Sequence, residues 1–413
     1  MLSRRLAALA IMCAILSCAF APAAAGPFSL HRNAYGAAFS GEDAYFLVAE
    51  NDKYGASGDT WYIHSARRML AGEPPVCELP KGTQPFGMLY ACADAVWYAR
   101  YSGALRTELE GEVHAALEFV RYEPATGNER VLVTDANPDA LFPMDGHTLS
   151  YLPWGDEYSL ATVDFAAQTD VLTLQVDDSL IWDAAMADGA LYLVLYSVQH
   201  DYEVLYRITE DGAEVLPDPV PEPGVSWLQG RHRVYATMEG DFYAAPLSDP
   251  TRSYALPMGG EQDDVYYFGD YRWLCEVEPG NVARLYRIPL AEGEQIYYLE
   301  YEALPQPFVR GADQQEMITL DRHGRLLSID AAFSSLTQVA QLEQNTLFTG
   351  VEWLWALPFP DYVVMLGYSA AAHDGPGGLE YPPDVARVVP RGEGMERGPH
   401  TFPPEATPIP SSD

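Results

Sequence analysis

Basic residues are scarce in this sequence, and lysine is nearly missing. Across 413 residues, Lys and Arg together number 24 against 59 Asp and Glu, the formal net charge is −35, and Lys53 and Lys81 are the only lysines. A surface of this sign repels polyanions. The composition therefore excludes nucleic acid and disfavours anionic lipid headgroups as partners. Solubility is the simplest explanation of the acidity, and cations, cationic wall components and neutral sugars remain open as ligands.

Cysteine is also scarce, with five in the chain. Cys13 and Cys18 lie in an apolar stretch near the N-terminus, which leaves Cys77, Cys92 and Cys275 for the rest of the chain. An odd set without CxxC spacing indicates neither a disulfide framework nor a zinc site. We expect buried thiols that behave as small apolar side chains, with a disulfide between Cys77 and Cys92 as the alternative.

Long apolar segments are missing beyond the N-terminal region, where the run Leu6 to Phe20 follows Arg4 and Arg5 and precedes the small residues Ala23 to Ala25. Spanning a bilayer takes about 20 apolar residues, so this run is too short for an anchor. The pattern predicts a signal peptide over residues 1–25 that is cleaved after Ala25. The protein is therefore expected to be secreted, without a transmembrane span.

A lipid anchor is the alternative for the location of the chain. The segment Ile15-Leu16-Ser17-Cys18 loosely resembles a lipobox, in which Cys18 would carry the lipid, but Leu16 stands where a small residue is usual. With either N-terminus, we expect residues 26–40 to lead into the folded part of the chain.

Apolar, aromatic and turn-forming residues are abundant. Hydrophobic residues make up 48% of the chain, with 27 Tyr and 8 Trp, and 33 Gly and 32 Pro interrupt the Tyr-rich segments. Tyrosine and β-branched residues favour strands, whereas Gly and Pro favour turns. The composition therefore predicts an all-β fold with a large core.

A short phrase recurs along the chain, consisting of an alternating strand, a polar turn usually with Gly, and a second apolar strand. The fourth residues of its copies are Ile63, Tyr122, Val163, Ile208, Ala245, Ile288 and Ile329. The spacing is about 42 residues, and one step that is about 17 residues longer fits an insertion from Ser102 to Glu118. Another apolar strand pair precedes most copies, which gives four short strands in each repeat.

One four-stranded sheet cannot bury both of its apolar faces alone, so neighbouring sheets must pack around a common axis. The repeat predicts a β-propeller of about seven four-stranded blades over residues 41–345. A parallel β-helix has shorter repeats, and two β-sandwiches have no reason to keep this step. Residues 346–369 are expected to form closing strands or an incomplete eighth blade. Residues 370–413 are rich in Pro and Gly and are expected to form a disordered tail.

Two copies carry the full phrase, namely Leu205-Tyr206-Arg207-Ile208 with Gly212 and Leu285-Tyr286-Arg287-Ile288 with Gly293. Over residues 43–345, the phrase resembles the repeats of secreted bacterial propellers related to TolB and of the YWTD propellers of lipoprotein receptors. The Tyr-Trp-Thr-Asp core of the receptor group is absent. The resemblance implies a scaffold that binds other molecules.

Sequence motifs for catalysis are missing. The nine His never form HxH or HExxH spacing, and the chain has no GxSxG elbow, P-loop or dinucleotide fingerprint. The pairs Asp156-Glu157, Asp177-Asp178 and Asp263-Asp264 offer the residue type of glycoside cleavage, but adjacent residues of a strand point to opposite faces. We therefore expect solvated loops at these pairs and assign no catalytic residue.

Two groups of residues are candidates for binding. Asn51, Asp52 and Asp59 flank a Gly-rich loop and offer hard oxygen ligands for Ca²⁺, although the loop lacks the closing Glu of an EF-hand. No other cofactor is expected. Several tryptophans recur near the starts of the repeats, where they can stack on a ligand, although such residues are more often buried between blades. These tryptophans are Trp97, Trp154, Trp182, Trp227 and Trp273.

Together these features predict a monomeric, extracytoplasmic protein at or outside the bacterial cell surface that binds a protein, a peptide or a glycan. The alternative is a secreted carbohydrate-active hydrolase or lyase that uses carboxylates around the central channel. A component of an envelope assembly, tethered through Cys18, is a third hypothesis. The binding hypothesis predicts an exposed aromatic surface, whereas the enzyme hypothesis predicts distant acids that meet in a channel pocket.

Overall fold

The computed structural model of the chain describes the residues that follow. They are 37–40, 43–50, 60–81, 83, 85–92, 95–102, 116–144, 147–176, 179–197, 202–209, 212–217, 225–237, 241–256, 265–268, 270–278, 282–292, 297–302, 316–320, 323–330, 336–342, 351–359, 361–369 and 385–391. The predicted signal peptide, with Cys18, lies outside these ranges. Within them, no helix is both long and apolar enough to cross a membrane.

The described strands form antiparallel sheets in which the order of the strands follows the order of the chain. The first sheet contains β1 (Ala37–Ser40), β2 (Asp43–Glu50), β3 (Thr60–Ser65) and β4 (Cys77–Glu78), with the short helix α2 (Ala66–Leu70) before β4. The second contains β5 (Pro85–Cys92), β6 (Ala95–Tyr101), β7 (Leu117–Glu123), β8 (Asn128–Pro143), β9 (Thr148–Pro153), β10 (Ser159–Asp164) and β11 (Thr169–Gln175).

Each of the remaining sheets has three or four strands. The third contains β12 (Ser179–Ala187), β13 (Ala190–Ser197), β14 (Tyr202–Thr209) and β15 (Gly212–Leu216), and the fourth contains β16 (Val225–Gln229), β17 (His232–Ala236), β18 (Phe242–Pro246) and β19 (Tyr254–Ala255). The fifth contains β20 (Val265–Phe268), β21 (Tyr271–Glu278), β22 (Val282–Pro289) and β23 (Tyr297–Glu302). The last two contain β24 (Glu316–Leu320), β25 (Arg325–Asp330) and β26 (Leu336–Gln341), then β27 (Val351–Pro358), β28 (Tyr362–Ser369) and β29 (Val385–Pro390).

The seven-stranded sheet contains two units that share the long strand β8. Residues of β8 from Asn128 to Ala136 pair with β7, whereas Ala136 to Pro143 pair with β9, and the register shifts between Ala136 and Leu141. β8 is therefore the last strand of one unit and the first strand of the next. We number the units 1 to 8 in chain order: β1–β4, β5–β8, β8–β11, β12–β15, β16–β19, β20–β23, β24–β26 and β27–β29.

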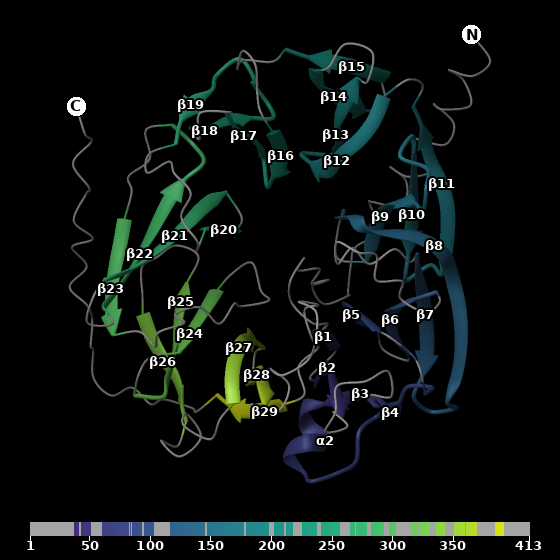
Figure 1. The fold of residues 1–413 in the computed structure, drawn as a ribbon, viewed down its shortest axis with the longest axis vertical. Helices are drawn as coiled ribbons and strands as arrows, with labels where there is room; N and C mark the ends of the chain where they lie inside the picture. The colour runs from purple at the N-terminus through teal and green to yellow at the C-terminus, as the bar shows by residue number, and fades with distance from the viewer. Residues whose placement is uncertain are drawn as a thin grey trace, which may run out of the picture.

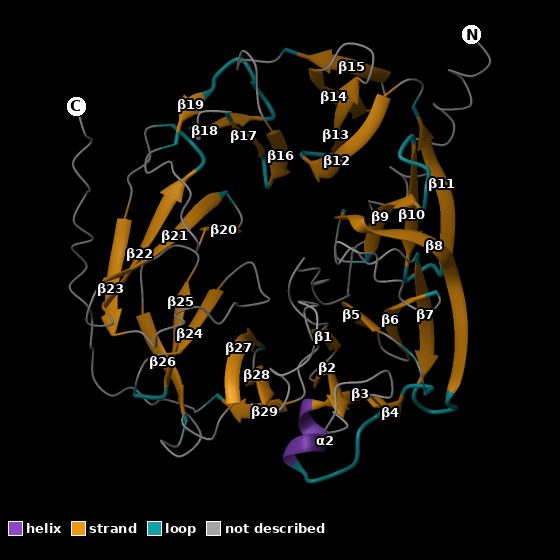
Figure 2. Cartoon of the chain, viewed as in Figure 1, coloured by secondary structure: helices purple, strands orange, loops and turns teal. Residues whose placement is uncertain are grey.

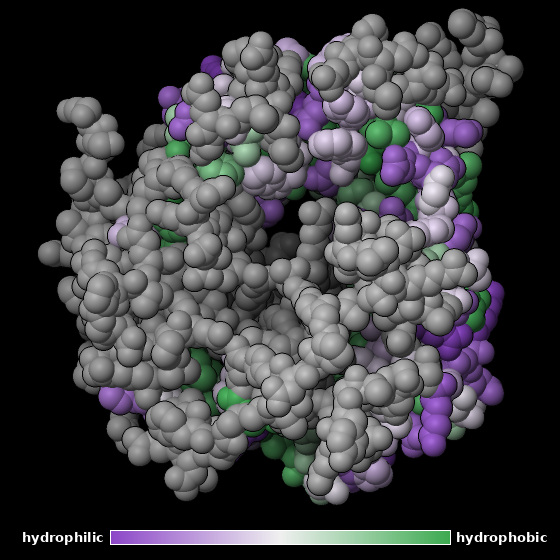
Figure 3. Space-filling model, viewed as in Figure 1, coloured by the Kyte–Doolittle hydropathy of each residue, from purple (hydrophilic) through white to green (hydrophobic). Residues whose placement is uncertain are grey.

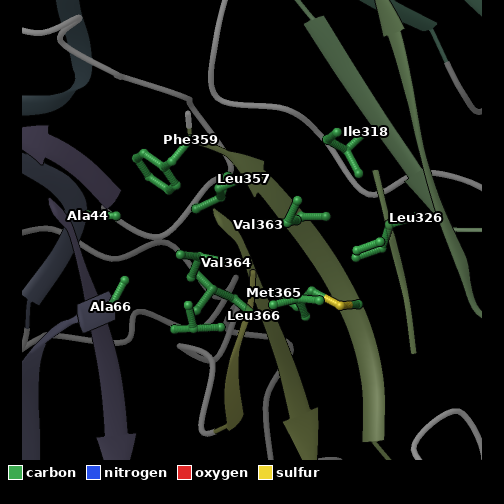
Figure 4. Close-up of a cluster of buried hydrophobic side chains, with 14 of the residues drawn as sticks. Ala44, Ala66, Ile318, Leu326, Leu357, Phe359, Val363, Val364, Met365 and Leu366 are labelled. Carbon is green, nitrogen blue, oxygen red and sulfur yellow. The ribbon is translucent and has the colours of Figure 1, made fainter. Parts of the chain in front are cut away.

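The units follow one another in a ring, and Figure 1 views this ring from one end. Figure 2 shows that strands make up almost all of the regular structure. The ring closes where unit 8 packs between units 7 and 1, and Figure 4 shows this contact. Ala44 and Ala66 of unit 1 and Ile318 and Leu326 of unit 7 belong to one buried cluster with Val363 to Leu366 of β28. The fold is a β-propeller, as the repeat predicts.

Strand β13 illustrates why each unit needs two neighbours. Successive side chains of a strand point to opposite faces of the sheet. Leu193 and Leu195 pack in a cluster with residues of β8 and β9 in unit 3, whereas Tyr192 and Val194 pack on the other face with Leu247 of unit 5. At roughly 25 cal/mol per Å² of apolar surface buried, such double-sided packing is the main stabilising contribution. The middle strands are accordingly apolar on both faces.

Two parts of the sequence-based prediction need correction. The predicted disordered tail from residue 370 includes β29, which pairs with β28 and has Val388 and Val389 buried. The β-branched residues Val385, Val388 and Val389 favour a strand once β28 offers an edge to pair with. The polar turn expected between β3 and β4 contains α2, whose N-cap Ser65 accepts a hydrogen bond from the backbone N–H of Arg68 at 3.2 Å.

Candidate functional site

Units 3 and 4 have several of their strand connections at the same end. In an antiparallel sheet, alternate connections lie at opposite ends. The β9–β10, β11–β12 and β13–β14 connections are therefore at the same end of the two units. The backbone N–H of Ile181, in β12, donates to the carbonyl of Glu157, in the β9–β10 turn, at 2.9 Å. This hydrogen bond joins the two units at that end.

Exposed aromatic side chains lie at this end of units 3 and 4. Trp154 and Tyr158 in the β9–β10 turn are 39% and 41% exposed, Trp182 near the start of β12 is 43% exposed, and Tyr202 at the start of β14 is 51% exposed. Trp182 stacks on Tyr196 of β13, with ring centroids 5.1 Å apart and planes at 23°. We call these five residues the aromatic surface. Large apolar side chains are usually buried, so such a group indicates a contact surface.

A bulge in β12 accounts for the exposure of Trp182. The register with β13 shifts between Ile181 and Asp183, so Trp182 is an extra residue in the strand. Ile181 is buried in the core between units 3 and 4, and the carboxylate of Asp183 accepts the backbone N–H of Leu228 in unit 5 at 2.7 Å. The residues on either side of Trp182 are thus fixed to the two neighbouring units, and the indole between them is left at the surface.

A buried ion pair lies close to the aromatic surface. Glu203 follows Tyr202 in β14 and pairs in register with Tyr196. Its Oε2 is 3.0 Å from Nη2 of Arg233 in unit 5 and accepts a hydrogen bond from the hydroxyl of Ser226. Arg233 Nε also donates to Ser226 Oγ at 2.9 Å. Because Glu203 belongs to unit 4 and its two partners belong to unit 5, the pair fixes the units to each other.

The guanidinium of Arg233 is not available to a ligand. Its side chain is fully buried, pairs with Glu203 and lies over the ring of Tyr235 at 4.6 Å from the centroid. The described stretches that carry the aromatic surface, 153–158, 179–183, 195–197 and 202–204, contain acidic residues and no Lys, Arg or His. Within these described stretches, an anionic ligand would therefore meet carboxylates and no basic side chain.

The predicted tryptophans lie in different surroundings. Trp154 and Trp182 belong to the aromatic surface, whereas Trp97 is 1% exposed and packs against Phe165 in the core, with ring centroids 5.2 Å apart. Trp227 is half-buried against Phe242. The side chain of Trp273 lies outside the described part of the structure. Burial between units removes Trp97 from contact with any surface ligand.

Sequence reasoning missed Tyr158, Tyr196 and Tyr202. Their positions at or next to strand ends are the signal that could have found them.

The predicted calcium ligands Asn51, Asp52 and Asp59 lie outside the described residues. Within the described residues, no group of three His, Cys, Asp or Glu side chains is placed to hold a metal ion. Cys77 is buried and is not in a disulfide.

A pair of acids beside the β9–β10 turn, Asp135 and Asp170, includes a perturbed carboxyl. The backbone N–H of Trp154 donates to the carbonyl of Asp135 at 2.5 Å. Lost hydration, and then the nearby charge of Asp135, raise the pKa of Asp170, while a hydrogen bond from the hydroxyl of Tyr151 at 2.8 Å opposes the shift. Burial likewise raises the pKa of Tyr151. Of the acidic pairs found in the sequence, Asp156-Glu157 lies in the β9–β10 turn and the other two are outside the described residues.

No protein-family model and no curated protein matches the chain. Among solved structures, PorZ, a surface component of the type-IX secretion system of Porphyromonas gingivalis, is 12% identical with a TM-score of 0.40, over 83% of this chain and 44% of PorZ. Oligogalacturonate lyase from Vibrio parahaemolyticus is 10% identical with a TM-score of 0.43, over 84% of this chain and 96% of that enzyme. TolB from Acinetobacter baumannii is 13% identical with a TM-score of 0.31, over 61% of this chain and 64% of TolB. The chain thus spans less than half the length of PorZ, and similarities at this level assign no function.

Proposed function

We propose that the protein is an extracytoplasmic binding protein that takes a neutral glycan on the aromatic surface. The observation that carries the proposal is Trp182, whose indole is stacked on Tyr196 and yet 43% exposed. An indole held in this way loses little conformational freedom when a ligand covers it. The C–H groups on one face of a sugar ring pack well against such a flat, electron-rich surface.

The extent of the surface fits a chain of sugars better than a single ring. Trp154 and Tyr158 come from unit 3 and Trp182 and Tyr202 from unit 4, and the hydrogen bond between Ile181 and Glu157 holds the two sets side by side. Carboxylates in the same turns can accept hydrogen bonds from sugar hydroxyls. The acidic surroundings, and the net charge of −35, disfavour polyuronates and other anionic glycans.

The location outside the cytoplasm rests on the expected signal peptide of residues 1–25. Recovery of the mature protein from the medium and mass spectrometry of its N-terminus test this part. A free Gly26 supports secretion, and a lipid-modified Cys18 would instead place the protein on the membrane.

Glycan binding is tested with the full chain and two purified oligosaccharides, the neutral cellohexaose and the anionic hexagalacturonate, by isothermal titration calorimetry. We expect the neutral hexamer to bind and the anionic hexamer not to bind. Trp182→Ala should weaken binding at least about tenfold, which corresponds to about 1.4 kcal/mol. Leu70→Ala is the matched control, because Leu70 is 46% exposed and lies in α2, in unit 1.

The proposal fails if no neutral oligosaccharide binds, or if Trp182→Ala and Leu70→Ala bind equally well. Tight binding of a Pro-rich peptide in place of sugars would assign the surface to a peptide. Chromatography of the oligosaccharides after incubation tests the enzyme hypothesis in the same samples, since a hydrolase or lyase would shorten them.

A further inference from the structure

A second surface is formed by β11, whose C-terminal end adjoins the β9–β10 turn. This strand is the last of the seven-stranded sheet, and among the described residues it pairs only with β10. Its first four residues are all exposed, and Val171 and Leu172 are 50% and 52% exposed. Figure 3 shows mainly hydrophilic residues on the side of the ring where β7, β8 and β11 lie, with hydrophobic residues among them. Two consecutive exposed apolar residues mean that both faces of this edge are open.

The backbone of β11 is suited to pairing. From Thr169 to Leu172 its register with β10 is regular, and the irregularity comes only after Leu172. In a regular edge strand, alternate residues direct their N–H and C=O groups outward, where another strand can bind them. The strand contains neither Lys nor Pro, which are the residues that usually protect such edges.

The outer strands β4, β15 and β19 are less suited than β11 to pairing with an added strand. β4 and β19 contain two residues each. β15 has five residues, begins with Gly212 and has Glu214 tied to Arg207 at 2.7 Å. A two-residue edge offers at most one pair of backbone hydrogen bonds. Of these outer strands, β11 therefore offers the longest ladder together with apolar side chains.

The charge around the β11 edge indicates which kind of partner segment it binds. Asp170 lies in the strand itself, and the charge of Asp135 is close enough to act on its carboxyl. Arg130, which binds Gln168 at 3.5 Å, is the opposing positive charge. Two copies of a chain with a net charge of −35 repel each other, whereas a basic segment is attracted.

We propose that β11 binds an extended basic peptide of a partner protein as an added strand. Its backbone pairs with residues 169–172, its apolar residues cover Val171 and Leu172, and its Lys or Arg side chains lie near Asp170. Backbone hydrogen bonds supply affinity in such strand addition, and the alternate side chains supply specificity. The occupant is a basic peptide and not a second copy, because the acidic charge acts against self-pairing.

The test uses the full chain and three fluorescein-labelled octapeptides: alternating Lys-Val, alternating Glu-Val and alternating Lys-Pro. Fluorescence anisotropy should show binding of the Lys-Val peptide only, because the Glu-Val peptide has the wrong charge and the Lys-Pro peptide lacks half of the strand donors. Val171→Lys should weaken this binding at least tenfold. Val215→Lys is the control, since Val215 is 59% exposed on the edge strand β15.

Hydrogen exchange supplies a second measurement, in which the amides of residues 169–172 should become protected when the Lys-Val peptide is added. The proposal is overturned if the Lys-Val peptide does not bind, if all three peptides bind alike, or if both Lys variants bind it equally. Peptide-independent dimerisation that Val171→Lys abolishes would assign the edge to a second copy. The outcome can be told apart from that of the glycan proposal, because Val171 is not one of the five residues of the aromatic surface.

Discussion

Removing one partner of the Arg233–Glu203 pair should be among the most damaging single changes in this propeller. The Arg233 and Glu203 side chains are 0% and 5% exposed, and the pair joins unit 4 to unit 5 beside the apolar contact between them. Replacing Glu203 by Leu leaves a buried guanidinium without its carboxylate, which costs about 3–5 kcal/mol. The Ser226 hydroxyl also loses its acceptor, at about 1 kcal/mol or more. We therefore expect Glu203→Leu to lower the free energy of unfolding by roughly 4 kcal/mol, an estimate within the range for a broken buried pair.

The double variant Glu203→Leu/Arg233→Met isolates the energy of the interaction between the two side chains from the effect of each single substitution. Because both charges are then absent, most of the lost stability should return. Urea unfolding of the wild type, both single variants and the double variant, followed by tryptophan fluorescence at one pH, gives the coupling between the residues. The effect should change little with salt, since a buried pair is poorly screened. Single variants that each cost less than about 1 kcal/mol, or effects that add within about 0.5 kcal/mol, would refute the assignment of a buried, coupled pair.

Three further predictions concern other parts of the fold. Leu366→Ala, at the closure of the ring where Leu366 is fully buried, should lower the free energy of unfolding by about 2–5 kcal/mol in urea, whereas the exposed Leu172→Ala should change it by less than about 0.5 kcal/mol. The raised pKa of Asp170 means that ionisation of this carboxyl destabilises the fold, so stability falls as pH rises through the folded-state pKa. Asp170→Asn should therefore gain stability relative to the wild type near neutral pH and not in acid, and equal urea midpoints at both pH values would contradict this. Burial raises the pKa of the Cys77 thiol, so peptide mapping should find it labelled much more slowly by iodoacetamide in the native protein than in urea, and equal rates would show that the thiol is accessible.

The repeat made the fold predictable because every unit must bury the apolar side chains on both faces of its sheet, and the same pattern of residues therefore recurs. Each marked residue, from Ile63 in β3 to Ile329 in β25, lies in a strand. The shared strand β8 was not predictable, because Asn137-Pro138 suggests the end of a strand. In the structure, this dipeptide lies where β8 changes partner, between Ala136 and Leu141, so the missing N–H of proline interrupts no ladder pairing recorded there.

For the candidate site, the sequence indicated the type of residue, tryptophan, but not which tryptophans are exposed. Tryptophan is equally apolar at Trp97 and Trp182, and both lie in strands. Trp97 lies in a middle strand whose first five residues are all buried, so its indole is enclosed. Trp182 is exposed because the bulge in β12 lets Ile181 face unit 3 and Asp183 bind unit 5, with one residue left over. A single inserted residue in a strand leaves no mark in composition or periodicity. The geometry that distinguishes a binding tryptophan from a core tryptophan is therefore set by contacts between units, at Asp183 and Leu228, that lie far apart in the sequence.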